Sequence, residues 1–278
     1  MKRIFILSAI VCSAISGFAQ TDSAAKPKVD TLKIGGMVII REGGGKDEKG
    51  QERKSFTITG RHNDKPSNVS TNWWILDIGF SNYSDKSNYA SLTPGVVAPG
   101  IVKDDMKLRA GKSRNINLWI ITQKVNLIEH VVNLKYGIGL ELNNYHFDNK
   151  DIQLNKTNPV ITEGFASRSL KKNKLAADYL TVPLMLNFDF TPNRHGKHFG
   201  MSGGVSAGYL YSSRQKIKDD GDVDKTKDDF GLRNFKLSYI GEISLGPVRI
   251  YGSYAFKSMF ENGLDITPYN VGFRFSNW

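Results

Sequence analysis

Eight segments of this chain alternate apolar and polar residues with a period of two, and this pattern constrains the fold more than any other feature. In residues 131–145, the even positions from Leu134 to Leu142 are apolar, whereas odd positions carry residues such as Lys135 and Glu141. Such alternation is typical of a β-strand with one apolar and one polar face. The other seven segments start near Trp74, Asn115, Asp178, Phe199, Phe235, Val248 and Tyr269.

The connections between these segments alternate strictly between long and short. In chain order they span residues 82–112, 124–130, 146–177, 191–197, 212–234, 246–247 and 258–267. This alternation predicts an all-β fold, an eight-stranded antiparallel up-and-down transmembrane β-barrel with short periplasmic turns and long external loops. A soluble eight-stranded barrel of the lipocalin type is the alternative, and it would turn its apolar side chains inward.

Aromatic residues gather at the two ends of the predicted strands. If the first strand runs outward, the periplasmic ends carry Trp74, Phe188, Phe190, Phe199 and Phe275. The outer ends carry Phe80, Tyr209, Tyr211, Phe235, Tyr254, Phe256 and Tyr269. Two such belts are expected where a membrane protein meets the two membrane–water boundaries. The belts therefore favour a location in the outer membrane.

The N-terminus has the layout of a secretory signal peptide. Lys2 and Arg3 precede an apolar stretch, and Gly17-Phe18-Ala19 supplies small residues at positions −3 and −1 of a cleavage site. Cleavage after Ala19 would leave 278 − 19 = 259 residues without the single Cys12, and would lower the formal charge from +11 to +9. No internal disulfide is then available, and no cysteine pair exists for structural zinc.

We expect three regions along the chain: a signal peptide at 1–19, a periplasmic extension at 20–72 and the barrel at 73–278. Within the extension, Leu32–Ile40 and Ser55–Thr59 are candidate strands of a periplasmic hairpin. Two isolated strands are marginally stable, so a short linker with a hairpin is favoured over a folded domain.

Two segments resemble the outer-membrane β-barrel family common in Bacteroidetes, the group that contains PorT-like proteins. They are Asn72-Trp73-Trp74-Ile75-Leu76-Asp77-Ile78-Gly79-Phe80-Ser81-Asn82-Tyr83 and Tyr179-Leu180-Thr181-Val182-Pro183-Leu184-Met185-Leu186-Asn187-Phe188. The resemblance covers about residues 72–278 and implies the barrel fold, with a PorT-like part in protein secretion as one expectation. Pro183 then requires a bulge or a locally distorted pairing. Trp278 departs from the pattern, one step out of register with Phe273 and Phe275.

Residues that could carry chemistry are few, so neither enzymatic activity nor a cofactor is expected. No Ser–His–Asp arrangement stands out at the strand ends. His195 and His198 share a predicted turn without a carboxylate or third ligand nearby. Asp220, Asp222 and Asp224 have the spacing of calcium ligands, which suggests a weak cation loop. Lys225 and Gly231 stand where an EF-hand requires Gly and Glu, however, and a solvated loop tip is the alternative.

The polar faces of the predicted strands carry charges of both signs: Asp77, Lys135, Glu141, Asp189, Lys236, Glu242, Arg249, Lys257 and Arg274. Eight strands enclose a lumen that side chains can fill. Because charges in a confined space are costly unless paired, we expect a lumen network of ion pairs. Glu141 and Glu242 are the expected central members, with Arg249 and Arg274 as their candidate partners.

These features predict a non-enzymatic outer-membrane barrel with a closed lumen that acts as a structural or partner-binding surface protein. The alternatives are a small passive pore and an outer-membrane lipid-modifying enzyme. Lys and Arg outnumber Asp and Glu by 38 to 27, and three of residues 171–174 are lysines, which suits contact with outer-membrane lipid and lipopolysaccharide. A protein partner could bind the loops or the periplasmic arm, and the surface location argues against nucleic acid.

Overall fold

The computed structural model describes residues 30–34, 37–42, 55–59, 67–92, 95–155, 161–163, 170–191, 199–219 and 222–276. The chain forms two compact units, Met1–Pro66 and Ser67–Trp278. The predicted signal peptide lies outside the described residues. In the described part of the chain, no helix is long and apolar enough to cross a membrane.

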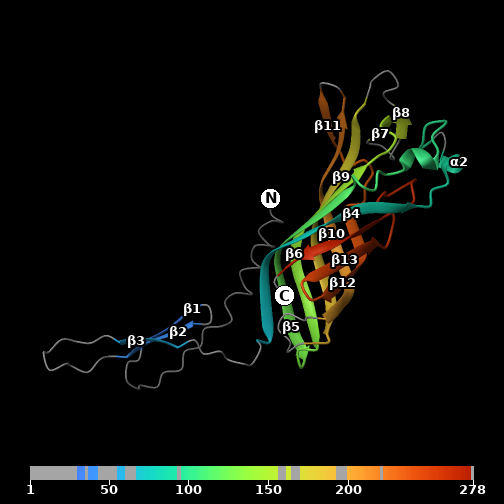
Figure 1. Ribbon diagram of the computed structural model, residues 1–278. Coiled ribbons are helices and arrows are strands. Elements are labelled where there is room, and N and C mark those ends of the chain that lie inside the picture. The colour runs from blue at the N-terminus through green and yellow to red at the C-terminus, as the bar shows by residue number, and fades with distance from the viewer. Residues whose placement is uncertain are drawn as a thin grey trace, which may run out of the picture. The chain divides into compact units, whose positions relative to one another are not determined.

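Eight antiparallel strands in the described part of Ser67–Trp278 close into a ring, which confirms the predicted barrel (Figure 1). In ring order they are β4 (Val69–Asp85), β5 (Arg114–Ile128), β6 (Val132–His146), β9 (Lys172–Asp189), β10 (Phe199–Lys218), β12 (Phe235–Leu245), β13 (Val248–Ala255) and β14 (Ile266–Phe275). The pairing of β14 with β4 closes the ring. The first strand begins at Val69, slightly before the predicted boundary at residue 73.

Apolar side chains point away from the barrel and polar side chains point into it. On β9, Leu180, Val182, Leu184, Leu186 and Phe188 are between 38% and 50% exposed. The residues between them, such as Thr181 and Asn187, are buried. This arrangement is the reverse of a soluble barrel that turns its apolar face inward. The lipocalin-type alternative is therefore excluded.

Two irregularities in the strands fit the sequence. Trp74 has a positive φ of 58°, and the β4–β5 pairing is interrupted at this residue, between the pairs Trp73–Ile121 and Ile75–Trp119. Trp73 and Trp74 are both exposed, at 62% and 65%. This local irregularity leaves two neighbouring side chains exposed on the outer face. The β6–β9 pairing is interrupted opposite Pro183, which has no N–H to donate. The distortion expected at Pro183 is thus present.

The outward-facing aromatic side chains make contacts between neighbouring strands at both ends of the barrel. Phe190 and Phe199 stack at the periplasmic end with ring centroids 5.2 Å apart. At the outer end, the rings of Tyr209 and Phe235 lie 5.3 Å apart. These pairs mark the two borders of the exposed apolar band.

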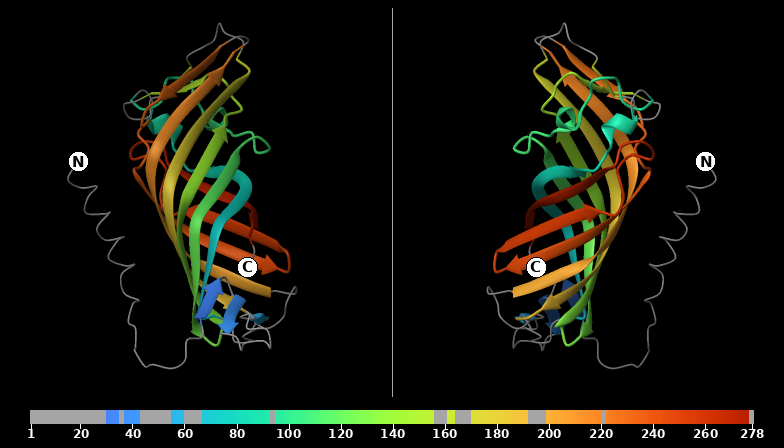
Figure 2. Two further views of the ribbon diagram at one scale, coloured as in Figure 1. Left: turned by 90° about the vertical axis from the view of Figure 1, so that its left-hand side faces the viewer. Right: turned by 90° about the vertical axis from the view of Figure 1, so that its right-hand side faces the viewer.

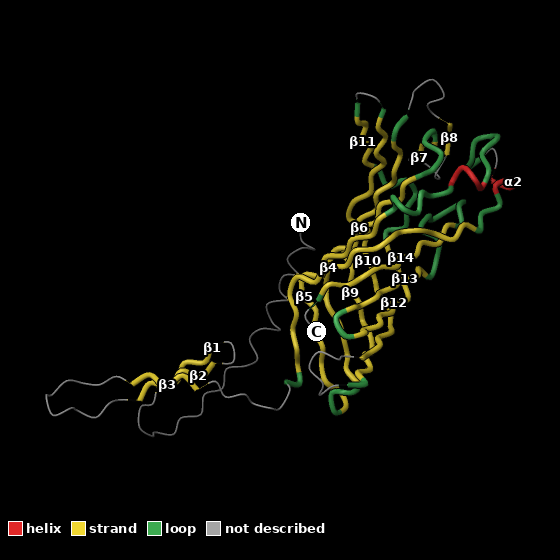
Figure 3. Tube along the Cα trace, viewed as in Figure 1, coloured by secondary structure: helices red, strands yellow, loops and turns green. Residues whose placement is uncertain are grey.

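Strands β9 and β10 extend into segments that were predicted as loops, so both are longer at their outer ends than expected (Figure 3). Lys172 and Lys174 belong to β9 and not to a loop, and β11 (Val223–Lys227) pairs with the outer end of β10. The polar residues of these extensions do not show membrane-type alternation, because both sheet faces lie outside the lipid. Pairing with neighbouring strands overrides their local sequence preference.

The outer connections fold into a compact cap above the barrel mouth (Figure 2). Their short elements are α2 (Tyr89–Leu92), η1 (Lys103–Met106), β7 (Ile152–Leu154) and β8 (Ile161–Glu163). The cap buries an apolar cluster that includes Val97, Met106, Phe147, Ile152, Phe230, Phe260 and Leu264 from the connections, with Tyr145 and Tyr179 from the barrel. Burial of these side chains stabilises the connections as one folded structure.

The N-terminal unit contains a three-stranded antiparallel sheet, not the predicted two-stranded hairpin. Its strands are β1 (Asp30–Ile34), β2 (Met37–Glu42) and β3 (Ser55–Thr59), with β2 in the centre. The segment expected as one strand is therefore two. The two residues between them are Gly35 and Gly36, a sequence typical of tight hairpin turns.

Candidate functional site

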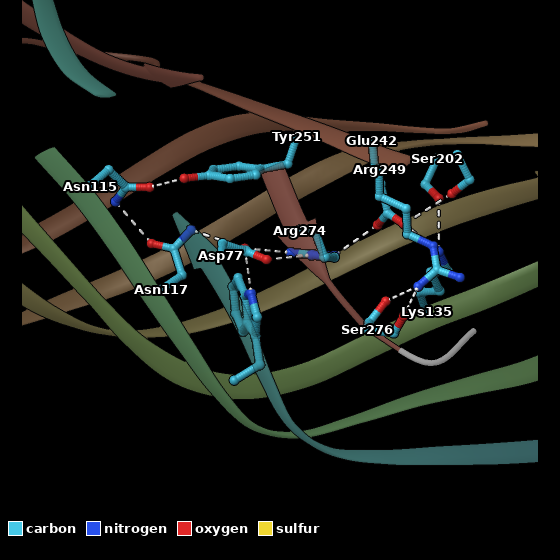
Figure 4. Close-up of polar contacts among 12 residues, drawn as sticks. Asp77, Asn115, Asn117, Lys135, Ser202, Glu242, Arg249, Tyr251, Arg274 and Ser276 are labelled. Carbon is cyan, nitrogen blue, oxygen red and sulfur yellow. Dashed lines mark hydrogen bonds and ion pairs between the residues drawn. The ribbon is translucent and has the colours of Figure 1, made fainter. Parts of the chain in front are cut away.

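The centre of the lumen contains four charged side chains that form a continuous chain of ion pairs (Figure 4). Arg274 binds Asp77 through two contacts, Nε to Oδ1 at 2.7 Å and Nη2 to Oδ2 at 2.8 Å. Its Nη1 donates to Glu242 Oε2 at 2.7 Å, and Lys135 Nζ donates to Glu242 Oε1 at 3.1 Å. All four side chains are less than 10% exposed. We call these four residues the lumen network.

Strand pairing explains part of this arrangement. Arg274 on β14 lies directly opposite Asp77 on β4. Glu242 on β12 and Lys135 on β6 reach the same place from other parts of the ring, and they are 107 residues apart in the chain. In a closed barrel, the stagger of the strands sets which inward residues share one level.

A second charged pair lies nearer the outer mouth. Lys236 Nζ donates to Glu141 Oε1, and it also lies 4.5 Å from the ring centroid of Tyr179. Glu141 Oε1 accepts further hydrogen bonds from Asn143 Nδ2 at 3.0 Å and Asn270 Nδ2 at 3.1 Å. The carboxylate thus has both a charge partner and amide donors, which is what a buried ion pair requires.

Several polar residues of the lumen were not predicted as site residues. Trp119 donates its indole N–H to Asp77 Oδ2 at 2.7 Å, and Asn117 Nδ2 reaches the same oxygen at 3.1 Å. Asn115 accepts a hydrogen bond from the hydroxyl of Tyr251. Asn115 and Asn117 alternate with apolar residues in the sequence, which was a usable signal. Trp119 continues the same alternation, and the register shift between β5 and β6 lies directly after it.

The structure brings Asp77, Lys135, Glu141, Lys236, Glu242 and Arg274 together in ion pairs. Arg249 lies near Glu242 (Figure 4), but its Nη1 donates to the carbonyl oxygen of Ser276 at 2.6 Å. Asp189 is buried at the periplasmic end of β9, where its Oδ1 accepts from the backbone N–H of Thr191. Of the two glutamates, Glu242 pairs with one of the expected arginines, Arg274, whereas Glu141 pairs with Lys236.

Lys257 does not point into the lumen, contrary to the prediction. The paired part of β13 ends at Ala255, and Lys257 lies in the outer connection with its side chain exposed. The period-two extrapolation fails here because the strand has already ended.

The segment predicted as a weak cation loop is partly a β-strand. Asp224 lies on strand β11, Asp222 precedes that strand, and Asp220 lies outside the described residues. An EF-hand winds its ligands around the ion, which an extended strand does not allow. His195 and His198 are outside the described residues as well. Across the described ranges, no three His, Cys, Asp or Glu side chains gather into a metal-binding group.

The free space around the lumen network is small. Two cavities beside Glu242 and Arg274 have volumes of about 10 and 30 Å³. Spaces of this size admit single water molecules. Chemically, the ion pairs of the lumen neutralise one another's charges and leave only small cavities beside Glu242 and Arg274.

The comparison with protein-family models agrees with this architecture. The family model described as outer membrane protein beta-barrel domain matches residues 113–261, more than half of the chain. One matching solved structure is the crystal structure of Ail, the attachment invasion locus protein of Yersinia pestis. It is 14% identical, with a TM-score of 0.31, and the match covers 73% of this chain and 97% of that one. No curated protein matches. From the match to the family model, we conclude that the chain is an outer-membrane protein that belongs to the outer membrane protein beta-barrel domain family.

Proposed function

We propose that this barrel is a non-enzymatic, closed outer-membrane protein that acts as a structural or partner-binding element of the cell surface. The observation that carries the proposal is the obstruction of the lumen at two levels. Ion pairs fill its centre, and the apolar cluster of the cap covers its outer mouth. A barrel built in this way offers folded external surfaces and no wide path for solutes.

Planar-bilayer recording tests the closed lumen against the passive-pore alternative. The purified mature protein should show no steady porin-sized conductance, because eight-stranded barrels are filled by side chains whereas porins have 16 to 18 strands, about twice as many. A variant without the cap segment 95–106 should also remain closed, because the lumen network is intact. Sustained conductance of the unmodified protein would contradict the proposal and favour the pore.

The partners we propose are outer-membrane lipid, lipopolysaccharide and a protein bound by the cap or by the periplasmic extension. The cap supports a protein partner because it is a folded surface and not a set of loose loops. Participation in secretion, as the PorT-like resemblance implies, is one specific form of this proposal. Nucleic acid is not among the proposed partners, because the protein lies in the outer membrane at the cell surface.

Cross-linking in intact cells tests the protein partner. A photoreactive residue at exposed Asn262 in the cap should give a specific adduct that mass spectrometry identifies. The matched control carries the same residue at Leu245 at the periplasmic end of β12, and it should not give that adduct. Identical adducts from both positions, or none from Asn262, would contradict a cap-bound partner. A lipid-modifying enzyme, the other alternative, would instead change the lipid composition when overproduced.

A further inference from the structure

The barrel wall has an interruption at its outer rim, between β12 and the connection that follows β13. Regular pairing of these strands ends at Ser238 and Ala255. Beyond that point, two backbone hydrogen bonds of 2.8 Å join the segments, from Phe256 N to Leu237 O and from Arg233 N to Met259 O. Between these two bonds lies a cavity of about 220 Å³, which we call the rim pocket.

The rim pocket opens beside the outward-facing apolar surface. Phe235, Leu237 and Phe256 line it with exposures between 42% and 71%, and the two phenylalanines belong to the outer aromatic border of the barrel. Lys236 and Tyr179 form its inner wall, and Lys236 is already neutralised by Glu141. The pocket is much larger than the space that one water molecule needs. It therefore connects the membrane-facing surface with a polar interior wall.

Two cations at this pocket lack a carboxylate partner. Arg233 donates from Nε to Ser258 O at 3.0 Å and from Nη2 to Glu261 O at 3.1 Å, and these carbonyls hold the guanidinium in place. A guanidinium has five N–H donors, so three remain. Lys257 is exposed at the same pocket. Within the described part of the chain, neither Arg233 nor Lys257 forms an ion pair.

We propose that the rim pocket binds the phosphate headgroup and the adjoining acyl chain of an anionic lipid in the outer leaflet. The positioned guanidinium of Arg233 and the ammonium of Lys257 are suited to a phosphate, which accepts charge-assisted hydrogen bonds. Phe235 and Phe256 supply the apolar side on which an acyl chain packs. The pocket lies at the outer aromatic border, and such aromatic belts lie at the level of the lipid headgroups. This inference gives the lipid partner of the proposed function a defined site and rests on that part of it.

Native mass spectrometry of the full mature protein in detergent tests the site, with phosphatidic acid and phosphatidylcholine of identical acyl chains as probes. We expect one tightly bound phosphatidic acid and an affinity about tenfold above that for phosphatidylcholine, since only the former presents an unshielded phosphate to both cations. The double variant R233Q/K257Q should lose this preference. The matched control K225Q/K227Q removes two exposed charges from β11 and should retain it.

Each other outcome overturns the site. Equal affinity of the unmodified protein for both lipids removes the headgroup recognition. If both double variants lose the preference for phosphatidic acid equally, the preference arises from the overall charge of the protein and not from this pocket. Inorganic phosphate that competes as well as the lipid would make the pocket a site for free anions. As a separate control for folding, the thermal unfolding midpoint of R233Q/K257Q should equal that of the unmodified protein. These results leave the bilayer test of the closed lumen unaffected, so the two proposals can fail separately.

Discussion

Replacing Glu242 by leucine should destabilise the barrel strongly, because it leaves the lumen network with an excess positive charge. Asp77 and Glu242 supply two negative charges, and Lys135 and Arg274 supply two positive ones. Without Glu242 the balance becomes one negative against two positive. Arg274 keeps its two contacts with Asp77, whereas Lys135 loses its ion pair with Glu242 and keeps its hydrogen bond to the hydroxyl of Ser202 at 3.2 Å.

The expected cost follows from the burial of Lys135. Removing one partner of a buried pair typically costs about 3–5 kcal/mol, because the remaining charge stays in a place of low polarity. Removing both charges of a pair is often nearly neutral. The double variant K135M/E242L should therefore recover most of the stability that E242L loses. The difference between the double variant and the sum of the singles measures the coupling of the two residues.

Denaturant unfolding in lipid vesicles, followed by tryptophan fluorescence, measures these changes. The matched control is E261Q, because Glu261 is an exposed carboxylate of the cap, and its midpoint should equal that of the unmodified protein. A loss below about 1 kcal/mol in E242L would place it in the range of exposed ion pairs and contradict a buried network. The reasoning would also fail if K135M/E242L were less stable than E242L alone.

Three further predictions concern the cap, the wall and the orientation of the barrel. His146 lies beyond the outer aromatic border, where burial and then nearby lysines lower its pKa from 6.5 to about 4. Because the folded protein favours the neutral imidazole, the contribution of His146 to stability should be complete above pH 6.5 and should be lost as the pH falls to 4. The unfolding midpoint should therefore be lower at pH 5 than at pH 7, and this difference should be smaller in H146Q. A methyl group added at Gly272 would lie 2.4 Å from the Cα of its neighbour on β4, so G272A should cost about 1–3 kcal/mol in the unfolding assay. G95A should cost nothing measurable, because no atom lies within 4 Å of the new methyl group, and equal effects of the two variants would refute the close packing. A membrane-impermeant maleimide should label D222C in intact cells and should label E129C only after lysis, whereas the reverse pattern would mean that the barrel is inverted.

The sequence alone determined the strand number and the direction of the side chains. Alternation such as that from Leu180 to Phe188 is a local property, since a strand turns successive residues to opposite faces. Because lipid surrounds a membrane barrel and its lumen is narrow and polar, the apolar face of each strand points outward. For the same reason the sequence predicted that Asp77, Glu242 and Arg274 point into the lumen. Lys257 was misplaced because the alternation was continued past the end of its strand.

Only the tertiary structure decided which inward charges meet. Glu242 contacts Lys135 across 107 residues of sequence because closure of the ring and the stagger of its strands bring β6 and β12 to the same level. The cap was likewise invisible to periodicity, because Val97, Phe147 and Phe260 lie in separate connections and gain stability only by packing together. Local pattern determines which way a residue points, whereas its partner depends on how distant segments are aligned.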